Sequence, residues 1–192
     1  REAGGQDVTT QAVSLSPLNI GYATTLGLVL GQAGELEEGL AVLQKVTSAP
    51  GYKDAAGWVN LGWIYRNMNR ADESIAAYKK GLELDPKQEQ AALGLGWAYN
   101  YTKNSDAAIK AYEQAIQIDP KEATPDATIG IAWSYFFKRD MAQARAFADK
   151  ATAAGRNGAL VKENVEKYEK AVAAGGARAT EELEAAREAQ QA

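Results

Sequence analysis

The sequence AAGWVNLGWIYRNMNRADESIAAYKKGLELDPKQ, residues 55–88, decides the fold because the residues that follow it repeat its pattern. A shift of 34 positions places Trp63 on Trp97 and Tyr78 on Tyr112. The glycine before each tryptophan and the Asp-Pro pair that closes each segment coincide under the same shift. Repetition with this period indicates an array of stacked two-helix units, each too small to bury its own apolar faces.

The spacing of apolar residues predicts two helices within this segment. Trp58, Leu61 and Tyr65 recur at intervals of three and four residues, so they lie on one face of a first helix. Asn69 is expected to cap a second helix, residues 71–84, which ends before a proline. The second helix presents an answering face, which consists of Ile75, Tyr78, Gly81 and Leu82.

The order of large, small and turn-forming residues in the segment carries a family resemblance. These residues are Trp58, Leu61, Gly62, Tyr65, Ser74, Tyr78 and Pro86. The segment resembles the tetratricopeptide repeat. This resemblance implies an all-α fold, a right-handed superhelical solenoid of antiparallel helix hairpins, and a protein–protein interaction scaffold that is not an enzyme.

Similar patterns extend the array over most of the chain. We expect a half repeat at 1–19, a degenerate repeat at 20–54, strong repeats at 55–88 and 89–122, a repeat with a two-residue insertion at 123–156, a capping helix at 157–175 and a charged, exposed tail at 176–192. The half repeat would be the second helix of a truncated preceding unit. Because the chain opens on Arg1, we expect a processed or shortened form of a longer protein.

Composition excludes several classes of function. With 21 Lys and Arg against 25 Asp and Glu, the chain carries a net charge of -4 and lacks the basic character of a nucleic-acid-binding protein. No apolar run approaches the roughly 20 residues of a membrane span. The sequence contains neither cysteine nor histidine, which removes disulfides, thiol chemistry, histidine bases and ordinary zinc sites. We therefore predict no catalytic, cofactor-binding or metal site.

The resemblance places the first helix of each repeat on a concave inner wall. Each of three such helices would expose one stripe of side chains there. The stripes are Val59, Trp63, Arg66 and Asn67 in the second repeat, Leu93, Trp97, Asn100 and Tyr101 in the third, and Ile129, Trp133, Phe136 and Phe137 in the fourth. One tryptophan of each stripe holds the same place in successive repeats, whereas Trp58 belongs to the core face. Because helices pack roughly 8–10 Å apart, three indoles could line an aromatic groove.

We predict that this groove binds a partner peptide or domain with apolar or aromatic anchors, because tryptophan and tyrosine dominate binding energy at interfaces. The amides of Asn67 and Asn100 could hold the backbone of an extended peptide. One alternative is that the large side chains only pack against their neighbours. Two others are self-association, in which a terminal helix fills a neighbour's groove, and the binding of a glycan or small ligand.

Cellular location is weakly constrained by the sequence. The lack of cysteine is compatible with either side of a bacterial inner membrane. We expect the cytoplasm, with the periplasm as the alternative.

Overall fold

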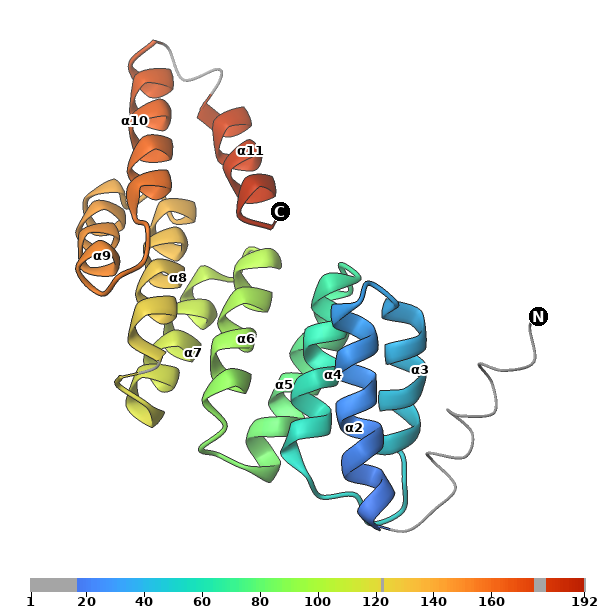
Figure 1. Ribbon diagram of the computed structural model, residues 1–192. Coiled ribbons are helices and arrows are strands. Elements are labelled where there is room, and N and C mark those ends of the chain that lie inside the picture. Colours follow the sequence, from blue (N-terminus) through green and yellow to red (C-terminus); the bar gives the residue numbers. More distant parts are fainter. Residues whose placement is uncertain (1–16, 122, 175–178, 192) are drawn as a thin grey trace. The chain divides into compact units, whose positions relative to one another are not determined.

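The computed structural model describes residues 17–121, 123–174 and 179–191, in which every regular element is an α-helix (Figure 1). The helices are α2 (Pro17–Gln32), α3 (Leu36–Thr47), α4 (Ala55–Asn67), α5 (Ala71–Leu84), α6 (Glu89–Tyr101), α7 (Ser105–Ile118), α8 (Ala123–Phe137), α9 (Met141–Ala153), α10 (Ala159–Ala173) and α11 (Ala179–Gln191). The expected all-α class and its helix hairpins are confirmed.

Two compact units divide the chain, an N-terminal lobe up to Gly94 and a C-terminal lobe from Leu95 onward. In the N-terminal lobe, α2 packs on α3, and α4 packs on both α3 and α5. The core there joins Leu43 of α3 to Leu61 and Ile64 of α4. In the C-terminal lobe, α8 packs between α7 and α9, and α10 packs on α9 and α11.

Each of four hairpins turns through one residue with a left-handed backbone. These residues are Gly34 (φ 91°), Asn69 (φ 58°), Lys103 (φ 62°) and Arg139 (φ 64°). In the second hairpin the amide of Arg70 donates to the carbonyl oxygen of Tyr65 over 2.9 Å, which is the six-to-one bond of a Schellman turn. Asn69 therefore ends α4, and its side chain does not cap α5 as the sequence had led us to expect. In the third hairpin Asn104 does cap α7, because its side chain accepts from the amide of Ala107.

A tyrosine from each of two second helices, α5 and α7, lies between successive first helices. Within the N-terminal lobe, Tyr78 lies against Gly62 and Gly94, where an added Cβ would stand 2.8 and 2.3 Å from ring atoms. Within the C-terminal lobe, Tyr112 lies in the same way against two glycines, Gly96 and Gly130, with distances of 2.6 and 2.3 Å. Glycine is needed at these helical positions because any side chain would occupy the space of the ring.

Both ends of the array differ from the expected boundaries. α2 begins at Pro17, a favourable residue for the first turn of a helix, instead of near residue 20. Pro17 therefore begins a helix, whereas the half-repeat prediction placed it at the end of one. Residues 1–16 of that half repeat lie outside the described residues. At the other end, α10 buries Val161 and Tyr168 as a capping helix would. The following segment is not an exposed tail, because α11 buries Leu183 and Ala186.

Candidate partner-binding surface

The first helix of the second repeat, α4, places two of its four candidate side chains in solvent. Arg66 and Asn67 are exposed near its C-terminal end. The Asn67 amide donates to the carbonyl oxygen of Trp63 over 2.7 Å, so its side-chain nitrogen is bound to its own helix. Val59 is buried, with a methyl group 3.1 Å from where a Cβ on Gly81 would lie.

The indole of Trp63 lies partly buried against α2, 2.9 Å from where a Cβ on Gly31 would stand. Trp58 is also partly buried, and both tryptophans pack against the same core cluster of the N-terminal lobe. The sequence placed Trp58 in the core and Trp63 on an open wall. The two tryptophans therefore differ less in burial than this prediction implies. Each indole keeps part of its surface accessible.

On α6, three of the four candidate residues are partly buried. Leu93 and Tyr101 are partly buried. Trp97 is also partly buried, with its ring edge-on to that of Tyr112 at a centroid distance of 6.3 Å and an interplanar angle of 88°. This packing fixes the indole of Trp97 from one side, since edge-to-face aromatic pairs are favourable.

Asn100 is fully buried and cannot hold a peptide as the sequence suggested. Its amide donates to the carbonyl oxygen of Gly130 over 3.3 Å, and its side-chain oxygen accepts from the hydroxyl of Ser134 at 2.9 Å. Asn100 therefore joins α6 to α8 inside the C-terminal lobe. Buried polar groups need such partners, because an unpaired amide would be costly.

The aromatic residues of α8 are in the core of the C-terminal lobe. Trp133 is only 3% exposed, and Phe136 and Phe137 are buried as well, while Ile129 is partly buried. The Trp133 ring stacks on Phe137 at 5.8 Å and meets Phe136 edge-on at the same distance. The expectation that Trp133 stands on an open wall is thus wrong for this structure.

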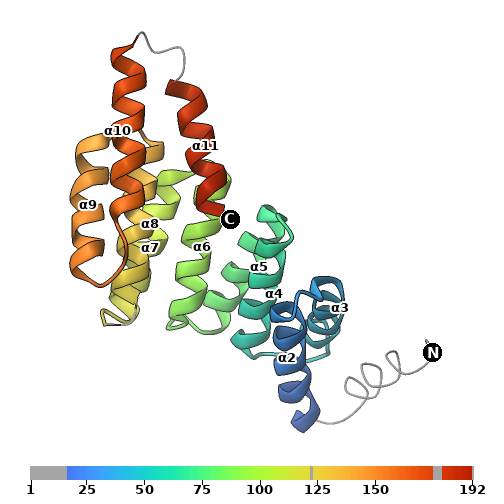
Figure 2. The same cartoon turned by 45° about the horizontal axis from the view of Figure 1, so that its top comes forward.

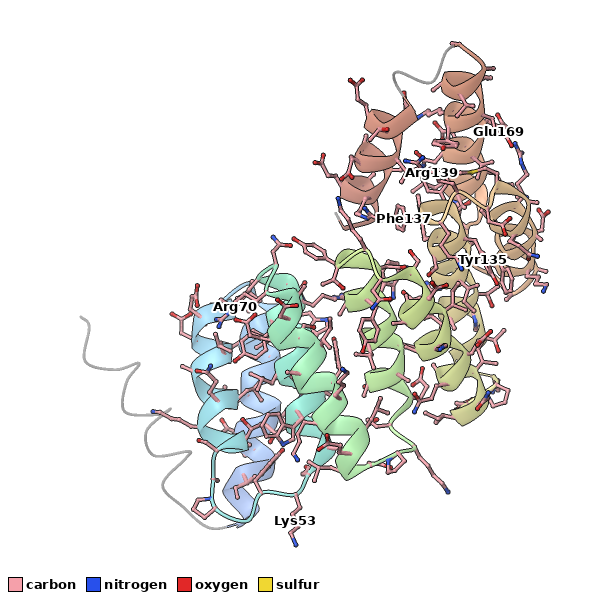
Figure 3. All side chains as sticks on the ribbon, turned by 180° about the vertical axis from the view of Figure 1, so that it is seen from behind. Lys53, Arg70, Tyr135, Phe137, Arg139 and Glu169 are labelled. Atoms are coloured by element: carbon pink, nitrogen blue, oxygen red, sulfur yellow. The ribbon has the colours of Figure 1, made fainter. Side chains whose placement is uncertain are left out.

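The physical reason is that α9, α10 and α11 all contribute side chains to the cluster around Trp133. Figures 1 and 2 both show α11 alongside α10, and Leu183 and Ala186 of α11 join the cluster that contains Trp133. The guanidinium of Arg187 lies 4.3 Å from the centroid of the Phe137 ring. Phe137 is labelled in Figure 3. Since α11 has only one large apolar side chain, its sequence carried little sign of this contact.

Polar contacts of α11 are weak or incomplete. The ammonium of Lys103, in the turn after α6, pairs with the Glu184 carboxylate at 2.9 Å, but both side chains are at least half exposed. Arg187 is buried, its Nε makes no hydrogen bond within the described residues, and the Glu184 carboxylate stands 3.9 Å from its guanidinium. Burial lowers the pKa of Arg187, because removal from water disfavours the charged form.

Comparison with known families now adds to this geometry. The sequence matches the family described as tetratricopeptide repeat over three overlapping segments, residues 24–89, 59–123 and 93–159, which together exceed half of the chain. The chain belongs to the tetratricopeptide repeat family. Members of this family are in general non-enzymatic scaffolds for protein–protein interactions. No curated protein matches the chain significantly by sequence.

Solved structures of other tetratricopeptide repeat proteins share the fold. A crystal structure of MamA has a TM-score of 0.67 at 22% identity, with 77% of this chain and 84% of that chain covered. A second MamA crystal structure has a TM-score of 0.64 at 24% identity, with 72% and 74% covered. YrrB, whose structure is described as a TPR protein with an unusual peptide-binding site, has a TM-score of 0.63 at 18% identity, with 73% and 71% covered.

The described residues also bear on metal binding and on membrane insertion. Within the described ranges, no group of three or more acidic side chains is placed to hold a metal ion. None of the helices in the described part of the chain is both long and apolar enough to cross a membrane.

Proposed function

We propose that this protein binds a partner peptide or protein through the faces of its first helices that remain accessible. On α4 these are Trp63, Arg66 and Asn67, and on α6 they are Trp97 and Tyr101. We treat the two sets as separate contact surfaces, one on each lobe.

The observation that carries the proposal is the environment of the Trp97 indole. Its ring packs edge-on against the Tyr112 ring, and the residue as a whole remains partly exposed. A rigid and partly exposed tryptophan loses little side-chain entropy on binding and offers a large apolar area. Trp63 repeats this arrangement on α4, where it packs against the N-terminal core.

The chemistry of these surfaces indicates the kind of partner. The N-terminal set combines an indole with an arginine and an amide acceptor, which suits a peptide that has an apolar anchor and a nearby carboxylate. The peptide-binding description of YrrB, a protein of the same fold, supports this class of partner. The family's general role as an interaction scaffold supports it as well.

A display library of short peptides, selected against the full chain, tests the proposal. Selected peptides are then titrated by calorimetry against Trp63→Ala and Trp97→Ala, with Glu113→Ala, an exposed position on α7, as the matched surface control. We expect at least one tryptophan variant to lose 2 kcal/mol or more of binding energy, the order of a hot spot, and the control to lose none. Peptides that bind both tryptophan variants as tightly as the wild type would refute the proposed surface.

A further inference from the structure

We propose that the aromatic surface of α8 and α10 beneath α11 is a helix-binding site and that α11 is its resident ligand. The inference goes beyond the proposed function, because it concerns a site other than the surfaces of α4 and α6, and it names a class of partner for this site. That partner is an amphipathic helix with leucine, alanine and arginine at positions i, i+3 and i+4. Such a helix would compete with α11 for the same aromatic surface.

The pattern of burial along α11 defines the anchors. Leu183, Ala186 and Arg187 are 7%, 2% and 7% exposed, whereas Ala185 and Glu188 on the other side are exposed. Residues separated by three and four positions share one face of a helix, so the three anchors form a single ridge. This is the way in which an amphipathic helix lies in an apolar groove.

The receptor surface is far more apolar than the helix that covers it. Trp133, Phe136 and Phe137 of α8 and Tyr168 of α10 belong to one buried cluster, with Phe136 6.2 Å from Tyr168 between ring centroids. Against these aromatic side chains, α11 offers one leucine, the methyl group of Ala186 and the guanidinium of Arg187. A guanidinium over an aromatic ring then supplies the specific contact.

The polar contacts of α11 with its surroundings are incomplete, so another helix can replace α11. The Nε of Arg187 is buried without a hydrogen bond in the described part of the chain, and such a group opposes burial. The ion pair of Glu184 with Lys103 is exposed on both sides, and pairs of that kind contribute little. A competing helix with the same three anchors loses nothing essential by lacking these polar contacts.

Neighbouring alanines of α11 provide a matched pair of variants. Ala186→Asp introduces a charge into the contact with α8, whereas Ala185→Asp introduces the same charge one residue away on the exposed side. Each variant is made in the full chain. The probe is a fluorescein-labelled synthetic peptide of residues 179–191 with the natural sequence, and binding is measured by fluorescence anisotropy.

We expect the peptide to bind the Ala186→Asp chain at least tenfold more tightly than the Ala185→Asp chain or the wild type. In those two chains α11 occupies the site, whereas in the Ala186→Asp chain the site is free. A peptide that itself carries the aspartate at position 186 should not bind. Equal affinity for both variant chains, with circular dichroism showing that α8 to α10 remain folded, would overturn the proposal.

Hydrogen exchange on the wild-type chain gives a second measurement that needs no variant. We expect the amides of α11 to exchange at least tenfold faster than those of α8 and α10, through an opening of α11 alone. Exchange of α11 together with α10 in one event would identify it as an ordinary core helix and refute the inference.

Light scattering tests whether a second copy is the occupant instead. A wild-type dimer that is lost in the Ala186→Asp chain would show that α11 covers a neighbour's α8, against the intramolecular contact proposed. A monomer at all concentrations supports the proposal. None of these experiments depends on Trp63 or Trp97, so this inference and the proposed function can fail independently.

Discussion

The ring of Tyr112 lies so close to the backbone of Gly130 that a Cβ atom added to this glycine would stand 2.3 Å from the ring's Cζ atom. Gly130→Ala therefore forces the ring or α8 to move, and we expect a loss of about 1–3 kcal/mol in the free energy of unfolding, the usual cost of overpacking. Urea unfolding followed by circular dichroism measures the loss.

Gly21→Ala is the control for that substitution. Gly21 is also inside a helix, α2, but nothing lies within 4 Å of the position that its Cβ would take. Alanine should raise stability here by about 0.5–1 kcal/mol, because it has the better helix propensity. If both glycine variants changed stability in the same direction, the packing of Tyr112 in the seam would be contradicted.

Trp97 and Trp133 should differ in how much each stabilises the fold. Trp133→Ala removes a side chain that is 3% exposed and should reduce stability by about 3–5 kcal/mol. Trp97→Ala should cost roughly half as much, because its indole is only partly buried. Thermal unfolding of the two variants side by side measures the difference, and equal losses would show that Trp97 is as fully enclosed as Trp133.

Asn67 and Asn100, to which the sequence analysis gave the same peptide-binding role, should differ in the same kind of experiment. Asn100→Ala removes the buried amide that bonds to the carbonyl oxygen of Gly130 and to the hydroxyl of Ser134, and it should cost about 1–3 kcal/mol of stability. Asn67 is exposed and bonds only to its own helix, so Asn67→Ala should change stability by less than about 0.5 kcal/mol. A stable Asn100→Ala chain with weakened peptide binding would instead restore Asn100 to the binding surface.

Burial raises the pKa of Tyr78 to about 12, because the phenolate would lose its hydration between the helices. In the unfolded chain the phenol ionises near its ordinary pKa of about 10. The folded state therefore holds a proton that the unfolded state releases, and stability should fall by about 2–3 kcal/mol as the pH rises from 10 to 12.

Tyr78→Phe isolates this effect from the ionisation of other groups. The phenylalanine chain should lose correspondingly less stability than the wild type over the same pH interval, as measured by urea unfolding at each pH. Absorbance at 295 nm in the folded wild type would show the late ionisation directly. A Tyr78 that ionised near pH 10 without loss of structure would contradict its burial.

The hairpins were predictable because their signal is repeated. Trp63 and Trp97, like Tyr78 and Tyr112, stand at one spacing in successive segments, and this periodicity predicted α4 to α7. The role of Asn69 was not recoverable from that segment alone, since asparagine suits both a helix cap and a left-handed turn. The equivalent residue in the next hairpin, Lys103, cannot act as such a cap and was the available clue.

The candidate surface was harder to predict, because burial depends on what covers a helix and not only on its own pattern. Trp133 has the same place in its repeat as Trp97, yet it lies in a core cluster to which α9, α10 and α11 also contribute. α11 buries Leu183, Ala186 and Arg187. In sequence, a helix with so few buried residues is hard to distinguish from a solvated charged helix. The partner-binding role of the accessible residues stays a prediction.

The tyrosine between two glycines has a consequence for how such a chain can change its length over evolutionary time. Since the Tyr78 ring lies between Gly62 and Gly94, a copied segment packs against α5 in the same way only if it carries a glycine at the place of Gly94. Copying a whole period from this part of the chain satisfies this condition without any further mutation.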